Sequence, residues 1–142
     1  MNSALPYSEI IKVRFRDTDS QGHLYFANYL VFADEITGFY MSQLGYNASN
    51  PGDVPCYIFT VNLNCDYLDE CKALDEIRVF TGYTRLGNSS AEVAFELYRE
   101  SDGVMLSKGS FTQVFVDKST RKSCPIPASF RASVIARQPE LA

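Results

Sequence analysis

Alternation of apolar and polar residues near the N-terminus predicts a strand over residues 9–17. Apolar side chains occupy one face of this segment (Ile11, Val13 and Phe15), and basic side chains occupy the other. This two-residue period is typical of a half-buried strand. A polar turn follows it.

Beyond the turn the apolar spacing changes to three and four residues, which predicts one long helix from Tyr25 or Phe26 to about Gly45. A glycine just past the last apolar position is typical of a helix C-terminus. About 19 residues at ~1.5 Å each give a helix of roughly 28 Å, long enough to cross a whole sheet. The apolar stripe comprises Phe26, Tyr29, Leu30, Ala33, Ile36, Tyr40 and Leu44.

The second half of the chain has the two-residue period of strands. Its Asn, Pro and Gly content predicts a loop at residues 47–55, and the clearest alternation follows it. Turn signals separate the later strands, so these are expected to be largely antiparallel. The predicted strands are 57–67, 76–86, 91–99 and 104–116, and a short helix is predicted at 128–136.

This order of elements predicts a single α+β domain over residues 1–142, in which one long helix packs on a five- to six-stranded antiparallel sheet. One helix cannot cover so wide a sheet from every side. We therefore expect a partner subunit to complete the burial, most simply in a two-fold homodimer, with a homotetramer as the larger alternative.

Composition narrows the function classes. The 142 residues are 46% hydrophobic, which suits a packed domain, and the net charge of −4 disfavours nucleic-acid binding, which needs a basic surface. No stretch approaches the roughly 20 apolar residues of a membrane span, and the first residues lack the features of a signal peptide. Four cysteines without a C-x-x-C pair and one histidine argue against a metal site. We expect a cytoplasmic protein with reduced thiols.

Candidate chemistry gathers in the turn between the first strand and the helix. A helix N-terminus has backbone N–H groups without intrahelical partners, which can polarise a carbonyl oxygen. Here the carboxylate of Asp19 and the histidine His23 stand just before that N-terminus, and a carboxylate there can act as general base or nucleophile. The alternative is that Asp17, Asp19 and Ser20 only form the turn and cap the helix.

The residues from Phe15 to Tyr29 resemble a family signature. They read F-R-D-T-D-S-Q-G-H-L-Y-F-A-N-Y, with an aromatic strand end, D-x-D-x-x-G and an Asn-Tyr pair at the helix start. This pattern resembles the hot-dog-fold acyl-CoA thioesterases of the 4-hydroxybenzoyl-CoA thioesterase-like family. The order of elements resembles the same fold over nearly the whole chain.

The resemblance implies roles for these residues. Asp19, the second aspartate of the D-x-D, takes the catalytic role, while the first, Asp17, is expected to be structural. His23 takes an active-site position, with a purely structural hydrogen bond as its alternative. The implied oxyanion and substrate-binding residues are Gly22, Tyr25, Phe26, Asn28 and Asp34. For Asp34 the alternative is an exposed helix charge.

In this family the CoA arm crosses a subunit interface and its phosphates meet basic side chains near strand ends. Arginine and lysine clusters suit such phosphates, and solvated charged turns are the alternative. The candidates are Arg85, Ser89, Ser90, Lys118, Arg121 and Lys122.

The sequence thus predicts an enzyme that hydrolyses a CoA thioester to a free acid and CoA, without a metal or redox cofactor. Its aromatic content allows a pocket for an aryl or a medium-chain acyl group. Two alternatives stay open, a hot-dog hydratase or dehydratase and a non-catalytic module that binds acyl-CoA or an acyl carrier.

Overall fold

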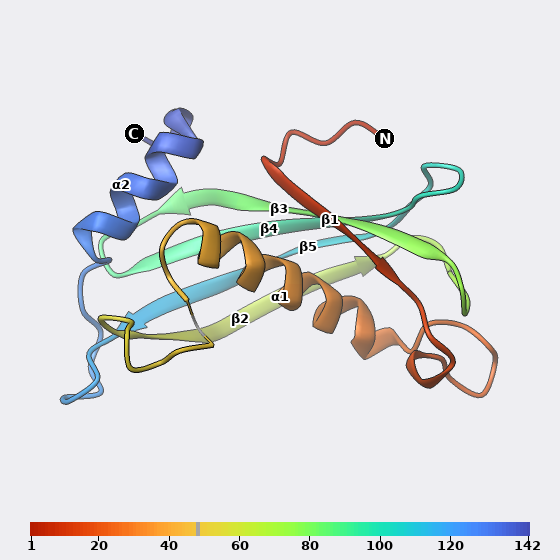
Figure 1. Cartoon of the computed structure of the whole chain (residues 1–142), viewed down its shortest axis with the longest axis horizontal. Coiled ribbons are helices and arrows are strands. Elements are labelled where there is room, and N and C mark those ends of the chain that lie inside the picture. The colour runs from red at the N-terminus through yellow and green to blue at the C-terminus, as the bar shows by residue number, and fades with distance from the viewer. Residues whose placement is uncertain (48) are drawn as a thin grey trace.

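Five strands form one antiparallel sheet that curves around a long helix, α1 (Figure 1). The computed structural model describes residues 1–47 and 49–142; the predicted loop at 47–55 includes residue 48, which lies outside this set. The sheet order is β1-β3-β4-β5-β2 with every neighbouring pair antiparallel, which confirms the predicted α+β hot-dog architecture. The strands are β1 (Tyr7–Lys12), β2 (Tyr57–Tyr67), β3 (Glu76–Leu86), β4 (Ser90–Arg99) and β5 (Met105–Val116).

The helix α1 (Phe26–Gln43) lies across the sheet and packs chiefly on β3, with β4 and β1 beside it. Its apolar stripe is buried as predicted from Tyr29 onward, and Gly45 ends it with a φ of +94°. Phe26 differs from the prediction because 60% of it is exposed. As the first helical residue it lies beyond the edge of the sheet, against the ring of Tyr25.

The first strand is shorter than predicted. It ends at Lys12, and residues Phe15–Asp17 form a 3₁₀ turn that leaves Phe15 79% exposed. The carboxylate of Asp17 causes this turn, because it accepts hydrogen bonds from the backbone N–H of Arg14 (2.9 Å) and its guanidinium Nε (3.2 Å). The prediction of a strand through residue 17 was therefore wrong beyond Lys12.

Strand β2 forms one edge of the sheet, and a bulge divides it. The register with β5 shifts between Thr60 and Asn62, so the face that points inward changes parity. Ile58 packs on the core before the bulge and Cys65 packs on it afterwards. The simple alternation predicted for residues 57–67 was therefore wrong at its centre, although the strand bounds are as predicted.

A second helix, α2 (Ala128–Arg137), closes the end of the sheet where α1 stops (Figure 1). Phe130 and Val134 anchor it in a core cluster that also holds Tyr40 and Tyr83. A separate cluster around Tyr29 fills the other end of the molecule. Within the described residues, no helix is both long and apolar enough to span a bilayer.

Candidate active site

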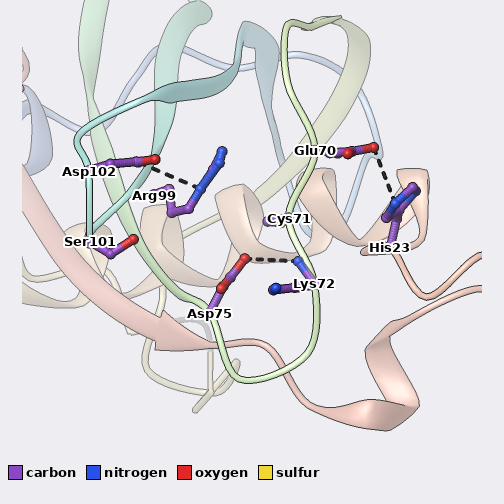
Figure 2. Close-up of a pocket in the computed structure, with 8 residues that line it drawn as sticks. All are labelled: His23, Glu70, Cys71, Lys72, Asp75, Arg99, Ser101 and Asp102. Carbon is purple, nitrogen blue, oxygen red and sulfur yellow. Dashed lines mark hydrogen bonds and ion pairs between the residues drawn. The ribbon is translucent and has the colours of Figure 1, made fainter.

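Two hollows adjoin each other at the N-terminal end of α1, and His23 and Glu70 line both of them. One of about 420 Å³ lies over the predicted turn and the helix start. The other, of about 410 Å³, lies behind it among charged residues (Figure 2). The first is lined by Asp19, Ser20, Gln21, His23, Leu24, Tyr25, Phe26, Tyr29, Tyr67, Asp69 and Glu70, and the second by His23, Glu70, Cys71, Lys72, Asp75, Arg99, Ser101 and Asp102.

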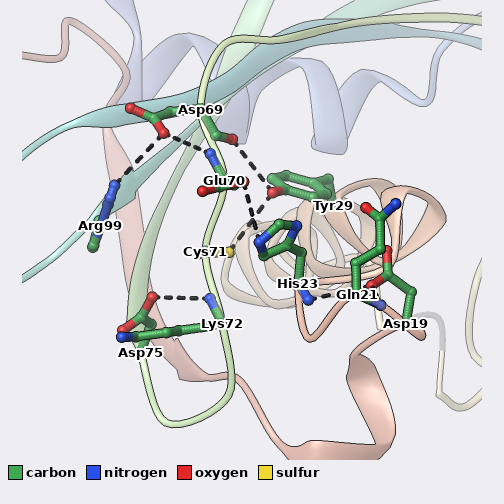
Figure 3. Close-up of polar contacts among 10 residues, drawn as sticks. All are labelled: Asp19, Gln21, His23, Tyr29, Asp69, Glu70, Cys71, Lys72, Asp75 and Arg99. Atoms are coloured by element: carbon green, nitrogen blue, oxygen red, sulfur yellow. Dashed lines mark hydrogen bonds and ion pairs between the residues drawn. The ribbon is translucent and has the colours of Figure 1, made fainter.

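The turn holds Asp19 by one carboxylate oxygen. Its Oδ1 accepts hydrogen bonds from the backbone N–H groups of Gln21 (2.9 Å) and His23 (3.2 Å), as Figure 3 shows. Gly22 closes the turn with a φ of +81°, a backbone conformation that favours glycine. Among the described residues, Oδ2 of Asp19 makes no hydrogen bond, so this oxygen can meet water or substrate.

Asp17, the first aspartate of the motif, is buried and structural. Burial alone would raise its pKa, but the hydrogen bonds from Arg14 and the charges of Arg14 and Arg16 outweigh burial and lower the pKa of this carboxyl. Its backbone oxygen accepts hydrogen bonds from the Tyr25 amide (2.9 Å) and the side chain of Asn28 (2.8 Å). Asn28 therefore braces the turn and does not line the hollow.

The start of α1 offers fewer open amides than the sequence suggests. The N–H of Tyr25 is engaged by Asp17, and the N–H of Gly22 donates to the backbone oxygen of Asp19 (3.1 Å). In the part of the chain that the structure describes, the amides of Phe26 and Ala27 have no hydrogen-bond acceptor. The predicted oxyanion donors Gly22 and Tyr25 are thus occupied, and Phe26 is the predicted donor that stays open.

Aromatic rings form the apolar wall of the first hollow. Tyr67, at the end of β2, meets Tyr29 edge to face at 5.1 Å between ring centroids, and its hydroxyl donates to the backbone oxygen of Phe26 (2.7 Å). Tyr29 is buried, which raises its pKa, and burial with neighbouring Cys65 raises the pKa of Tyr67 to about 12. Both hydroxyls therefore stay protonated near neutral pH and can donate hydrogen bonds.

His23 is paired with an acidic residue. Its Nε2 lies 3.2 Å from Oε2 of Glu70, in the connection between β2 and β3 (Figure 3). The sequence indicated a site role for His23 but not for Glu70, Tyr67 or Asp69, which follow more than 40 positions later in the chain. No local pattern marks these three residues, because only the return of β2 to the helix start brings them to the turn.

Asp34 does not reach this site within one chain. It lies on the outer face of α1, beside a separate groove of about 450 Å³ that also involves Phe39 and Asn47. Although Asp34 is largely exposed, neighbouring atoms displace enough water from its carboxylate to raise its pKa. The structure therefore places Asp34 apart from Asp19.

The predicted CoA-binding residues gather at the opposite end of the sheet, where β3 and β5 end and α2 begins (Figure 1). The guanidinium of Arg121 lies over the ring of Tyr57 (5.0 Å), at the start of β2, and Lys118 lies over the same ring (5.9 Å). We name Lys118, Arg121 and Lys122 the basic cluster. Arg85, Ser89 and Ser90 occupy the neighbouring turn, where Arg85 contacts the hydroxyl of Ser90.

The basic cluster and the first hollow of the same chain lie much farther apart than a side chain can reach. The 11 residues of β2 run from the basic cluster to the first hollow, which is roughly 33 Å at the rise of a strand. No residue of the basic cluster lines either hollow of its own chain. Nor do the described residues include a group of three or more His, Cys, Asp or Glu side chains placed to hold a metal ion.

Comparison with known proteins places this site in context. The chain is 24% identical over 113 residues to the uncharacterised protein YsmA of Bacillus subtilis, covering 80% of this chain and 74% of that protein. It superposes with a TM-score of 0.85 on a thioesterase from Thermus thermophilus complexed with coenzyme A and Zn, at 22% identity and coverage of 97% and 98%. A 1,4-dihydroxy-2-naphthoyl-CoA thioesterase from Synechocystis gives 0.83, at 19% identity and coverage of 90% and 94%.

A sequence match assigns the chain to a family. Residues 13–134 match the thioesterase-like superfamily, a span that includes the turn, α1 and the whole of β2 to β5. The chain belongs to the thioesterase-like superfamily, which confirms the predicted class, a thioester hydrolase with the hot-dog fold.

Proposed function

We propose that the protein hydrolyses an acyl-CoA thioester to a free carboxylic acid and CoA at the hollow between Asp19 and the start of α1. One observation carries this proposal. Asp19, with one oxygen anchored and the other open, lines the same hollow as Phe26, whose backbone amide has no acceptor among the described residues. A base and an oxyanion donor on one cavity are what acyl transfer to water requires.

The reaction follows from these positions. The free oxygen of Asp19 takes a proton from a water molecule that attacks the thioester carbonyl carbon, or attacks that carbon itself. The open amide at Phe26, helped by the partial positive charge of the helix N-terminus, stabilises the oxyanion. The carbon–sulfur bond then breaks and the thiol leaves with a proton. On the route in which Asp19 attacks, water then hydrolyses the acyl–Asp19 anhydride, which releases the free acid and restores the carboxylate. This hydrolysis requires water and a carboxylate, so the proposal includes no metal or redox cofactor.

The acyl group is proposed to lie against the rings of Tyr67, Phe26 and Tyr29. These side chains form an apolar wall next to Asp19. Flat or extended acyl groups can pack on such rings, whereas the nucleotide of CoA needs cations for its phosphates. Among the described residues, the lining of the first hollow includes no lysine or arginine.

A second copy of the chain can supply these cations. Strand β2 is a free edge of 11 residues whose apolar side chains remain exposed at Phe59 (42%), Val61 (59%) and Leu63 (48%). Such an edge is a template for strand pairing. If two copies pair β2 about a two-fold axis near its middle, the strands run antiparallel, and the Tyr57 end of one copy meets the Tyr67 end of the other.

In this dimer the basic cluster of one subunit stands beside the hollow of its partner. Each site then combines Asp19 from one chain with Lys118, Arg121 and Lys122 from the other. The CoA-bound T. thermophilus thioesterase shares the fold along nearly its whole length, which supports a CoA thioester as substrate. We therefore propose a homodimer with two composite sites.

The test is release of free thiol from a panel of CoA thioesters with short, medium, long and aryl acyl groups. We expect wild type to hydrolyse at least one of them. Asp19→Asn should lower kcat about 10²- to 10⁴-fold, the usual contribution of a general base, while the substrate still binds. Asp53→Asn is the matched control: Asp53 is exposed, bonds Asn50 and does not line the hollow, so this variant should keep the activity of wild type.

One alternative reaction gains support from the structure. The contact between His23 and Glu70 is a histidine–carboxylate pair, the kind of pair that hot-dog hydratases use. The panel therefore includes a 2-enoyl-CoA, whose double bond absorbs in the ultraviolet. Loss of that absorbance without thiol release would indicate hydration and would contradict the thioesterase proposal.

A further inference from the structure

We propose that Glu70 is a positioning residue that holds His23 where it protonates the sulfur leaving group. This role rests on the proposed thioester hydrolysis and assigns His23 to its second half, the cleavage of the carbon–sulfur bond. The position of the two residues supports this role: His23 and Glu70 each line both hollows, and their side chains contact each other where the hollows adjoin.

A contribution to folding stability does not explain this pair, because both side chains are exposed. The side chains of His23 and Glu70 are 39% and 66% exposed, and their contact is 3.2 Å. Ion pairs between side chains as exposed as these add little to folding stability. Yet the ring of His23 follows directly on the turn that anchors Asp19, since the backbone N–H of His23 donates to the Asp19 carboxylate (3.2 Å). The backbone of His23 is therefore in direct contact with Asp19, the proposed base.

The backbone presents Glu70 from a fixed position. The amide of Glu70 donates to the side chain of Asp69 (2.8 Å), and on its other side the oxygen of Cys71 accepts from the amide of Leu24 (2.8 Å). Leu68, two residues before Glu70, donates to the backbone oxygen of Leu106 (2.8 Å). A connection tied down on both sides of Glu70 keeps its carboxylate facing His23.

Other charges surround the ring at longer range. Around the second hollow, Lys72 lies beside Asp75 and Arg99 lies beside Asp102 (Figure 2), and Arg99 reaches Asp102 at 3.6 Å. Of the described residues, Glu70 is the acidic side chain within ion-pair distance of His23. The charged and titratable groups that line the two hollows with His23 are Asp19, Tyr25, Tyr29, Tyr67, Asp69, Glu70, Cys71, Lys72, Asp75, Arg99 and Asp102.

The chemistry explains why a proton donor belongs here. When water adds to the carbonyl carbon, a carbon–oxygen bond forms, one water proton passes to Asp19, and the carbon–sulfur bond breaks. An alkyl thiol has a pKa near ~8.5, so its thiolate takes a proton readily from an imidazolium, whose usual pKa is about 6.5. His23 gives that proton to sulfur, and the proton on Asp19 returns to the imidazole through solvent.

The test varies the leaving group. We would compare two esters of one acyl group that wild type accepts, the N-acetylcysteamine thioester, with an alkyl thiol, and the thiophenyl ester, whose aryl thiolate leaves without a proton. We expect Glu70→Gln to lower kcat/KM about 10- to 100-fold on the alkyl thioester and by less than about 3-fold on the aryl ester. His23→Gln should show the same selectivity, and the double variant should be no worse than His23→Gln alone.

Asp102→Asn is the matched control, because Asp102 lines the second hollow without contacting His23. It should leave both esters unaffected, and all variants should keep the melting temperature of wild type. An equal loss on both esters, or no loss with Glu70→Gln, would overturn the role of Glu70 alone. No thioester hydrolysis by wild type would overturn the proposed function and this role together.

Discussion

The two ends of α1 differ in how completely they are covered and how fully their polar groups are paired. At its C-terminal end, α2 covers the sheet, and one side chain beneath it, Gln138, pairs the backbone of Tyr83 and the hydroxyl of Tyr40. At its N-terminal end no second helix of the described chain packs, two hollows open, and one oxygen of Asp19 is left without a partner among the same residues. The C-terminal end of α1 is therefore closely packed, whereas its N-terminal end is hollowed and leaves a carboxylate oxygen open.

This difference between the two ends is the basis of the proposed composite site. The open end holds a carboxylate, an open amide and aromatic rings, whereas the closed end holds the basic cluster beside Tyr57. Strand β2 runs from one end to the other with an exposed apolar edge. In the proposed dimer, a second, antiparallel copy of β2 brings the two kinds of end together.

The largest effect on stability is expected at the closed end. Strand β1 pairs with β3 only as far as Thr81, so the backbone of Tyr83 relies on Gln138, which bonds its N–H (2.9 Å) and its oxygen (2.7 Å) and accepts the Tyr40 hydroxyl (2.9 Å). Gln138→Ala should cost about 2–4 kcal/mol, because it leaves three buried polar groups unpaired. Urea unfolding measures this cost.

The exposed Gln43 provides the control for that measurement. It lies near the same end, and its one side-chain hydrogen bond within the described residues comes from Arg137 at 3.5 Å. Gln43→Ala should therefore change the free energy of unfolding by less than about 0.5 kcal/mol. Hydrolysis by folded Gln138→Ala at low temperature should equal that of wild type. A strong loss of activity without a loss of stability would contradict the expectation that Gln138 supports folding and not hydrolysis.

A smaller effect, confined to acid, is expected in the turn that carries the basic cluster. Backbone and side-chain hydrogen bonds from Thr120 and Ser119 lower the pKa of Asp117 to about 2. A carboxyl whose pKa is lower in the folded state stabilises the fold above its unfolded pKa, near ~4, and loses that contribution as the pH falls toward the folded value. Wild type should therefore exceed Asp117→Asn in stability at about pH 6, and the gap should close between about pH 4 and pH 2.

Ser119→Ala removes one donor to Asp117 and should give a smaller gap over the same pH window. Unfolding curves measured at several pH values would show both effects. A gap that stays constant through this window would mean that the charge of Asp117 does not hold this turn.

The sequence predicted the elements whose periodicity is long and regular. The bounds of β3 and the body of α1 were correct because burial on one face imposes a clear period. The bounds of β2 were also correct, although most of this strand is exposed. The end of β1 was missed because a local bond, from Arg14 to Asp17, overrides alternation there. The bulge in β2 was missed because its cause lies in the pairing with β5.

The same reasoning applies to the candidate site. Asp19 and His23 could be found from sequence because the turn and the helix start are local to them. Glu70 could not, since it meets His23 only through the path of β2 and the connection that follows it. The occupied amide of Tyr25 was equally hidden, because its acceptor is the backbone of Asp17 in a turn that sequence assigned to a strand.

Co-expression of two differently tagged variants tests the central claim most directly. One carries Asp19→Asn and the other carries Arg121→Glu with Lys122→Glu, and each alone should form a dimer with low kcat/KM. In the purified heterodimer one site combines the intact Asp19 with the intact basic cluster, so about half of the wild-type kcat/KM should return. A heterodimer as inactive as its parents, or a protein that sediments as a monomer, would contradict the composite site.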